Sequence, residues 1–410
     1  MSEHSAYAPA SLAQLGERLA PRLDAILDLA RRLTEIESGS YVPAGVDGVS
    51  ELVAARLAAI GFTPTWHEVA PGRGRAFEAT LDTGRPGVRV LLLGHADTVW
   101  PAGECTDWVT DIDADMMSGP GLGDMKCALA MAVHAVEAVL EGGELETAAP
   151  GVASLTYALV PDEELGSVDS RDWLRDLGRR TDLCLALEAG LADGGVIVSR
   201  GAVGAMVVTA RGRTAHSTEG TGASALRALA PLVDELEDLT DRDARTICSV
   251  GILRAGTARQ VVPDHAELHL DLRAPDEAAG RALVAEVRRR AHARAGDGVV
   301  VEISGGITRP ALPSAVTDPV YALAERLVGP DHARLPGLRL HRIEEMGGSD
   351  ASIVGEVAPL ALDGLGPLAF EQCSRAERVQ RDSVVPRTAL LAALVAHAGE
   401  LAVHLPESVR

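Results

Sequence analysis

Residues 91–99 read LLLGHADTV, and this stretch decides the fold of the chain. With VRV at 88–90 before it, the apolar run predicts a buried strand of a mostly parallel sheet. Ligands of open α/β sheets bind at the carboxyl ends of such strands, where this one places His95 and Asp97. A histidine there can bind a metal ion while the aspartate holds its other ring nitrogen. A surface histidine that follows a strand is the alternative interpretation.

Strand and helix patterns alternate along the first half of the chain. Leucines at helical spacing predict an opening helix over 13–36 that is interrupted or entered at Pro21. The same criteria predict further helices over 49–60 and 127–140, and strands over 64–68, 76–81, 152–160 and 183–187. Alternating strands and helices argue for an α/β layered domain.

The pattern changes after Arg200. Alternating stretches predict strands over 205–210, 266–272 and 299–303, with helices over 223–239 and 276–293. We interpret this segment as a β-α-β-β-α-β domain of the ferredoxin-like α+β type. The α/β pattern resumes over 316–327. We therefore predict a discontinuous catalytic domain, residues 1–200 and 310–410, with a second domain inserted over residues 201–309.

The composition is that of an ordinary soluble protein, with 47% hydrophobic and 24% charged residues among 410. The formal charge of −21 argues against a nucleic-acid partner and against an anionic membrane surface, because both need clustered Lys and Arg. Five scattered cysteines predict a reducing compartment without disulfides. Residues 1–15 lack a signal-peptide pattern, and no stretch is long and apolar enough to cross a bilayer. We therefore expect a cytoplasmic protein.

Acidic side chains gather at the ends of the predicted strands and in the loops beside them. These positions hold His95 with Asp97, Asp124, Glu163 with Glu164, and Glu188. Carboxylates that converge in one cleft need a cation to neutralise them, so we predict a metal site. One histidine and several carboxylates suit zinc, cobalt or manganese. In the adjacent pair of glutamates, one can bind metal while the other takes a proton from water. Acids that cap the next helix are the alternative interpretation.

Five motifs resemble those of the M20 metallopeptidases: GHADTV at 94–99, GPGLGDMK at 119–126, DEELGS at 162–167, LE at 187–188 and TAH at 214–216. The family includes glutamate carboxypeptidases, acetylornithine deacetylases, succinyl-diaminopimelate desuccinylases and aminoacylases. Through EELGS and through IESG at 36–39, the chain looks most like the bacterial glutamate carboxypeptidase branch. The resemblance spans nearly the whole chain. It implies a zinc-peptidase-like catalytic domain and an inserted lid through which the chain forms a homodimer.

The resemblance also implies a centre with two Zn²⁺ ions per chain, for which Co²⁺ or Mn²⁺ can substitute; a single ion is the alternative. Asp124 matches the carboxylate that bridges the two metals. His95 and Glu188 match ligands of one metal, and Glu164 matches a ligand of the other. Glu163 matches the general base, and Asp97 matches the partner of the metal-bound histidine.

Three further matches concern the substrate. His216 matches the lid histidine that reaches, often across the dimer, to the scissile carbonyl or its oxyanion; a surface histidine in a turn is the alternative. Arg273 matches the lid arginine that clamps a substrate carboxylate with two nitrogens; a surface cation at a strand end is the alternative. Gly347, Gly348 and Ser349 match a glycine-rich loop that lines the substrate pocket, where a plain turn is the alternative.

Two positions depart from the family. Its last metal ligand is a histidine in the context G-x-H-S/T-x-x-E, whereas QCSRAE at 372–377 puts Cys373 at that place. Because a thiolate binds zinc well and favours zinc over manganese, we predict that Cys373 is a ligand. A weakened or empty second site is the alternative. In RQVVP at 259–263, Gln260 replaces the usual asparagine, so an amide that contacts the substrate is moved outward.

We therefore predict a metal-dependent amidohydrolase, similar to a carboxypeptidase, that cleaves an N-acyl amino acid, a dipeptide or a related small amide with a free carboxylate. A water activated by the metals attacks the carbonyl, and Glu163 passes the proton of this water to the leaving amine. One rival hypothesis is a diverged member with a cysteine-containing or single-metal site that runs a specialised pathway reaction. A non-catalytic binding homologue is the other. A hydrolase with Cys373 as nucleophile is more distant, because no histidine base is evident beside it.

Overall fold

The computed structural model describes residues 9–146, 151–191, 193–329, 335 and 338–407. The chain divides into two compact units. The first unit contains Met1–Val198, Pro313–Ile343 and Ser349–Arg410, and the second contains Ser199–Leu312 and Glu344–Gly348. The two main boundaries lie a few residues from those predicted from sequence. The short segment 344–348, which the prediction assigned to the catalytic domain, belongs to the second unit.

The first unit is built on a six-stranded sheet with the order β1-β2-β6-β3-β7-β14. Its strands are β1 (Thr63–His67), β2 (Ala76–Asp82), β3 (Gly87–His95), β6 (Gly151–Val160), β7 (Leu183–Ala186) and β14 (Leu360–Leu362). The four strands from β6 to β14 run parallel, and β2 and β1 add an antiparallel edge. The prediction of a mostly parallel sheet with the 91–99 stretch at its centre is therefore confirmed.

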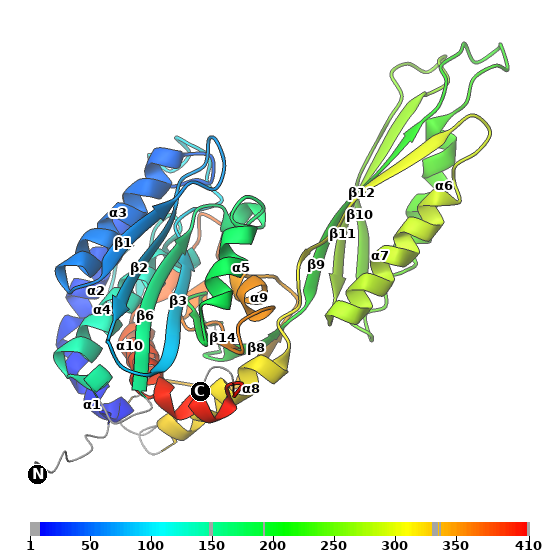
Figure 1. Ribbon diagram of the computed structural model, residues 1–410. Helices are drawn as coiled ribbons and strands as arrows, with labels where there is room; N and C mark the ends of the chain where they lie inside the picture. The colour runs from blue at the N-terminus through cyan, green and yellow to red at the C-terminus, as the bar shows by residue number, and fades with distance from the viewer. Residues whose placement is uncertain (1–8, 147–150, 192, 330–334, 336–337, 408–410) are drawn as a thin grey trace, which may run out of the picture. The chain divides into compact units, whose positions relative to one another are not determined.

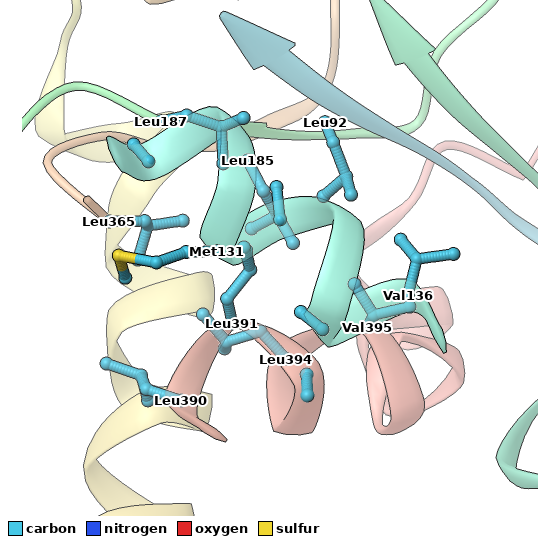
Figure 2. Packing of buried hydrophobic residues seen from close by; sticks show 14 of the residues in the cluster. Leu92, Met131, Val136, Leu185, Leu187, Leu365, Leu390, Leu391, Leu394 and Val395 are labelled. Atoms are coloured by element: carbon cyan, nitrogen blue, oxygen red, sulfur yellow. The ribbon is translucent and has the colours of Figure 1, made fainter. Parts of the chain in front are cut away.

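Both faces of β3 are buried, as expected of a strand in a parallel sheet that helices cover on each side. Leu92 belongs to a core shared with two long helices, α4 (Cys127–Glu141) and α10 (Arg381–Ala396). Its neighbours Leu91 and Leu93, which point to the opposite face, are also buried. Figure 2 shows the core from nearby. Two side chains of α4, Met131 and Val136, lie there among Leu92, Leu185, Leu187, Leu365, Leu390, Leu391, Leu394 and Val395.

Helices surround this sheet in the first unit (Figure 1). They are α1 (Leu12–Leu19), α2 (Leu23–Thr34), α3 (Pro43–Ala59), α5 (Arg171–Arg179), α8 (Ser314–Val328) and α9 (Asp350–Gly355), besides α4 and α10. The predicted interruption of the opening helix is confirmed, since a 3₁₀ turn at Ala20–Arg22 separates α1 from α2. Helix α3 begins at Pro43 and not at the predicted residue 49, because proline is well suited to the first position of a helix.

A second, smaller sheet of the first unit was not predicted. It has the order β15-β16-β5-β4, with strands β4 (Asp111–Ile112), β5 (Met116–Ser118), β15 (Ala369–Phe370) and β16 (Arg378–Gln380). The strands are only two or three residues long, so periodicity could not reveal them. In the antiparallel pairing of β5 with β16, Ser118 lies opposite Arg378. The loops 119–126 and 371–377 therefore leave this sheet at the same end.

The second unit contains a four-stranded antiparallel sheet with the order β10-β11-β9-β12. Its elements follow the chain as β9 (Ala202–Arg211), α6 (Ala225–Glu237), β10 (Ile247–Ala255), β11 (His265–Ala274), α7 (Glu277–His292) and β12 (Val300–Arg309). This β-α-β-β-α-β order and the strand order confirm the predicted ferredoxin-like domain. Strand β10, whose second half is exposed, was not located from the sequence.

Two further strands, β8 (Val196–Arg200) and β13 (Arg342–Glu345), pair with each other. Among the described residues, no single helix has the length and hydropathy of a membrane span. Helix α10 passes that test only jointly with the bent segment Ala398–His404, and α10 is buried within the core of the first unit.

Candidate metal centre

Three neighbouring parallel strands deliver His95, the pair Glu163 and Glu164, and Glu188 to one end of the large sheet. His95 is the last residue of β3 and lies in register with Val160, the last residue of β6. The segment that follows β6 carries Glu163 and Glu164 in a short 3₁₀ turn. Glu188 follows β7, which pairs with the other side of β3. The carboxyl ends of these strands therefore meet, as open α/β sheets require of a ligand site.

A cluster that can hold a metal ion forms at this end. His95, Asp124 and Glu164 each offer one ligand atom, and these atoms all lie within 4.8 Å of one another. The Nε2 atom of His95 lies 3.0 Å from Oδ1 of Asp124. His95 is 1% exposed, whereas the two carboxylates are half-buried. One imidazole nitrogen and two carboxylate oxygens at this spacing match the ligand chemistry of a divalent transition metal.

Asp97 connects the histidine to the glutamate pair. Its backbone oxygen lies 3.0 Å from Nδ1 of His95, and one carboxylate oxygen lies 3.4 Å from the same nitrogen. The carboxylate also accepts hydrogen bonds from the backbone N–H of Glu163 (3.1 Å) and of Glu164 (3.2 Å). Ser40, which the sequence did not single out, donates its hydroxyl to Asp97 at 2.6 Å. A buried aspartate thus fixes both the ring of His95 and the backbone that presents Glu163 and Glu164.

The loop that carries Asp124 is held by Glu377. This carboxylate is fully buried, and it accepts hydrogen bonds from the backbone N–H groups of Gly121, Gly123 and Asp124 at 3.3, 2.6 and 2.9 Å. Burial raises the pKa of Glu377 to about 7, although these hydrogen bonds favour the charged form. Sequence reasoning did not include Glu377 in the site. Its signal was its match to the glutamate of the family motif G-x-H-S/T-x-x-E, four residues after Cys373.

The site concentrates negative charge. Burial, reinforced by the charge of Asp124, raises the pKa of Glu164 to about 9 and that of Glu188 well above its usual range. Burial disfavours the charged form of His95, but its hydrogen bonds to Asp124 and Asp97 prevail and hold its pKa well above the usual value. All three shifts mean that added positive charge is favoured at this site. A bound cation would supply that charge and neutralise the carboxylates.

Cys373 lies against the cluster. Its Sγ atom is 3.5 Å from Oδ2 of Asp124, on the carboxylate whose other oxygen faces His95. Its backbone adopts a positive φ of 58°, which is uncommon for a residue with a side chain. Cys373 is exposed as a residue, but partial desolvation of its thiol, followed by the charges of Asp124 and Glu164, raises the pKa of the thiol. The structure therefore brings Cys373, the fifth predicted protein ligand, against the carboxylate of Asp124.

Arg387 organises the loop that carries Glu188. The guanidinium is buried in α10 and donates hydrogen bonds to the backbone carbonyls of Gly194, Gly364 and Gly366. Gly366 in turn donates its N–H to the carbonyl of Glu188 at 2.7 Å. Because a buried guanidinium needs acceptors for its donors, this arrangement ties the segments that follow β7 and β14 to each other.

The predicted lid residues belong to the second unit. His216 and Gln260 are exposed and lie on adjoining segments. The N–H of Ser217 donates to the carbonyl of Gln260, and His216 forms an isolated antiparallel β-bridge with Val261. Nδ1 of His216 lies 2.8 Å from the hydroxyl of Thr218. On β11, both nitrogens of the Arg273 fork bind the Asp271 carboxylate, at 2.9 and 3.0 Å. The substrate-binding roles of these residues stay predictions.

The predicted pocket loop is divided between the units. Gly347 and Gly348 belong to the second unit, where the carbonyl of Gly347 accepts a hydrogen bond from Arg200 at 3.0 Å. Ser349 belongs to the first unit and is buried. Its hydroxyl caps α9 through the N–H of Ala351 and donates to Asp363 at 2.6 Å. Its hydroxyl is therefore engaged within the fold, and the predicted contact of the loop with substrate stays a prediction.

Comparison with known proteins identifies the family. Residues 197–299 match the model of a peptidase dimerisation domain. Succinyl-diaminopimelate desuccinylase from Gluconobacter oxydans is 30% identical over 369 residues, which cover 82% of this chain and 88% of that protein. Carboxypeptidase G2 from a Pseudomonas species is 25% identical over 252 residues, which cover 61% of this chain and 60% of that protein.

A solved structure supports the same conclusion for the fold. The Bacillus subtilis YXEP protein, described as a dinuclear metal-binding peptidase from the M20 family, superposes with a TM-score of 0.68 at 17% identity, over 93% of this chain and 99% of that chain. With the relative of 30% identity and the matched dimerisation domain, the chain belongs to the M20 metallopeptidase family. It is a hydrolase of the class that cleaves peptide and amide bonds with metal ions.

Proposed function

We propose that this protein hydrolyses the amide bond between an acyl group and an amino acid with a free carboxylate, at a centre of two zinc ions. N-acyl amino acids and dipeptides are the substrate class. The observation that carries the proposal is the cluster of His95, Asp124 and Glu164, whose ligand atoms lie within 4.8 Å of one another beside Glu163. The names of two relatives, a carboxypeptidase and a desuccinylase, agree with amide cleavage next to a carboxylate.

The residues at the site fit zinc. A buried imidazole, several carboxylates with raised pKa values and an adjacent thiol form a donor set of nitrogen, oxygen and sulfur atoms, which zinc accepts. His95, Glu188 and Asp124 would hold one ion, and Glu164, Cys373 and Asp124 the other. When bound, zinc polarises the scissile carbonyl and makes water a stronger nucleophile at neutral pH.

The residues of the chain have distinct roles in this mechanism. Glu163, held through its N–H by Asp97, takes the proton of the attacking water and passes it to the leaving amine. Asp97 keeps the ring of His95 in orientation. His216 donates to the oxyanion, and Arg273 binds the substrate carboxylate with two nitrogens after exchanging its present partner, Asp271. The dimerisation domain matched at residues 197–299 supports a homodimer that forms through the second unit.

A panel of substrates tests the proposal. Purified zinc-loaded protein is incubated with N-acyl glutamates, N-succinyl amino acids and dipeptides, each with its carboxyl-amidated counterpart, and release of free amine is measured. We expect hydrolysis of at least one carboxylate-bearing compound and a large loss of kcat/KM for its amidated counterpart. Absence of turnover across the panel would contradict the enzymatic proposal. Equal turnover of the amidated compounds would contradict the carboxylate specificity alone.

The role of Cys373 is tested by spectroscopy. Cobalt-loaded wild type should show the near-ultraviolet charge-transfer absorbance of a cobalt–thiolate bond, and Cys373→Ser should lose it together with one of the two metals. Cys373→His should retain two metals without this absorbance. A second candidate, a specialised single-metal enzyme, follows from the same departure from the family histidine. It is favoured instead if wild type holds one metal and Cys373→His gains the second.

A further inference from the structure

Glu377 joins two loops of the metal centre that are far apart in sequence. Its hydrogen bond to Gly123 spans 254 residues. The small sheet explains the encounter: β5 ends at Ser118 opposite Arg378, the first residue of β16, so loops 119–126 and 371–377 emerge side by side. Glu377, the residue just before β16, is therefore placed against the backbone that presents Asp124.

The contact is built for a carboxylate. Two oxygens receive three backbone N–H groups, and Glu377 is fully buried. The receiving backbone needs glycine to come this close. A Cβ atom on Gly123 would lie 2.9 Å from the Cβ of Ala369 and 3.2 Å from Oε1 of Glu377. Gly121 has a φ of +66°, and a Cβ there would lie 2.4 Å from a methyl carbon of Thr98.

Glu377 also fixes the loop of Cys373. The N–H of Glu377 donates to the carbonyl of Ser374 at 3.1 Å, and the hydroxyl of Ser374 donates to the carbonyl of Glu371 at 2.7 Å. The seven-residue connection between β15 and β16 is thus a closed turn that has Glu377 as its last residue. The Glu377 carboxylate, which binds the backbone of the Asp124 loop, therefore also fixes the position of Cys373, whose Sγ atom lies 3.5 Å from Oδ2 of Asp124.

We propose that Glu377 is a positioning residue that holds Asp124 and Cys373 in register and thereby determines the affinity of the second metal. This inference rests on the proposed function, in which Asp124 and Cys373 belong to the same metal. Glu377 is assigned as a ligand of neither metal. In the assignment above, it positions two of the three protein ligands of the second metal but only one of the three of the first. Loss of Glu377 should therefore lower the binding affinities of the two metals unequally.

The test compares zinc binding in the full-length protein. Zinc-free wild type and Glu377→Gln are titrated with zinc in equilibrium dialysis against a competing chelator, and both dissociation constants are determined. The amide of glutamine cannot accept all three N–H groups. We expect one zinc to lose about 10–100-fold in affinity, the usual effect of removing a partner of metal ligands, and the other to change much less. The weakened zinc should be the one whose cobalt substitute gives the cobalt–thiolate absorbance, because that marks the site of Cys373. Cobalt-loaded Glu377→Gln should also lose cobalt–thiolate absorbance at the metal concentration that saturates wild type.

Two variants control for indirect effects. Glu144 is a comparison residue: it is fully buried in the same unit and accepts a backbone N–H from Ala10 at 2.7 Å, and it also pairs with Arg18 at 3.1 Å. Glu144→Gln should reduce thermal stability without changing either zinc affinity. Gly123→Ala keeps Glu377 but crowds the amides away from it, so it should reproduce the loss at the site that contains Cys373. This variant also decides the question if Glu377→Gln fails to fold.

The outcomes separate this inference from the proposed function. Unchanged affinity at both sites in folded Glu377→Gln, or in Gly123→Ala, would overturn the positioning role and leave the proposed function intact. An equal loss at both sites would also overturn it, because a general loosening of the fold would then explain the result. Wild type that binds no zinc would overturn the proposed function and this inference with it.

Discussion

The metal centre of the first unit and the predicted substrate residues of the second differ in how firmly their surroundings hold them. His95 and Asp97 are each 1% exposed, and buried hydrogen bonds join them to Asp124 and to the glutamate pair. His216 and Gln260 are exposed, and His216 has one side-chain partner, Thr218. Ligands that must hold a metal are fixed before it binds, because misplacement weakens every bond to the ion. Groups that meet the substrate can stay mobile until it arrives.

The largest effect is expected for the general base. Glu163→Gln keeps the shape of the side chain but cannot take a proton, so kcat should fall by about 10²–10⁴-fold. Because the residue is assigned no metal, zinc content measured by elemental analysis should stay at the wild-type value. A variant that retains most of the wild-type kcat would remove Glu163 from the chemistry.

The next effect is expected in the second unit. His216→Gln should lower kcat by about 10²–10³-fold, the usual effect of losing one donor to an oxyanion. Zinc affinity should stay unchanged, since the residue belongs to the other unit and its ring contacts Thr218. Steady-state kinetics measure the expected loss of kcat, and a zinc titration on the same preparation checks that zinc affinity is unchanged. Altered zinc binding in this variant would contradict the assignment of metal binding to residues of the first unit alone.

A smaller effect on turnover but a direct effect on metal is expected at Asp97. Asp97→Asn replaces a carboxylate that accepts from Glu163, Glu164 and Ser40. Zinc affinity should fall by about 10–100-fold, because the orientation of His95 is no longer fixed. Addition of excess zinc should then restore much of the activity. If activity is lost while zinc affinity is unchanged, Asp97 has a role other than orienting the histidine.

The smallest expected effect is the dependence of zinc affinity on pH. In the zinc-free protein the raised pKa values of Glu164, about 9, and of Glu188 and His95 keep protons on these groups at neutral pH. Binding of zinc must displace them, so zinc affinity should rise with pH by about tenfold per pH unit for each proton released. Calorimetric titrations in two buffers with different ionisation enthalpies measure the number of protons. A value of zero at pH 7 would contradict the charge distribution described here.

Sequence predicted the part of the site that depends on strand ends. The apolar runs before His95, Glu163 and Glu188 are long enough to define β3, β6 and β7, and parallel strands bring their carboxyl ends together. The ferredoxin-like unit was predictable for the same reason, since most of its strands alternate clearly.

The rest depends on contacts between distant segments. The pairing of β5 with β16 involves strands of three residues, and no local pattern specifies it. Glu377 stands at the glutamate of the family motif, but its sequence position gave no sign that it holds the backbone of Asp124 across the small sheet. Ser40 was missed for the same reason: its partner, Asp97, lies 57 residues along the chain. Hydrogen bonds of this range become visible only when the fold is known.

A zinc titration of metal-free protein tests whether hydrolysis depends on two bound zinc ions. Metal is removed with a chelator, zinc is added back in steps, and bound zinc per chain and hydrolysis of the best panel substrate are measured on the same samples. We expect negligible hydrolysis without metal and a rate that rises with bound zinc until two ions are held per chain. Undiminished hydrolysis by the metal-free protein, or zinc binding that restores no activity, would contradict this expectation.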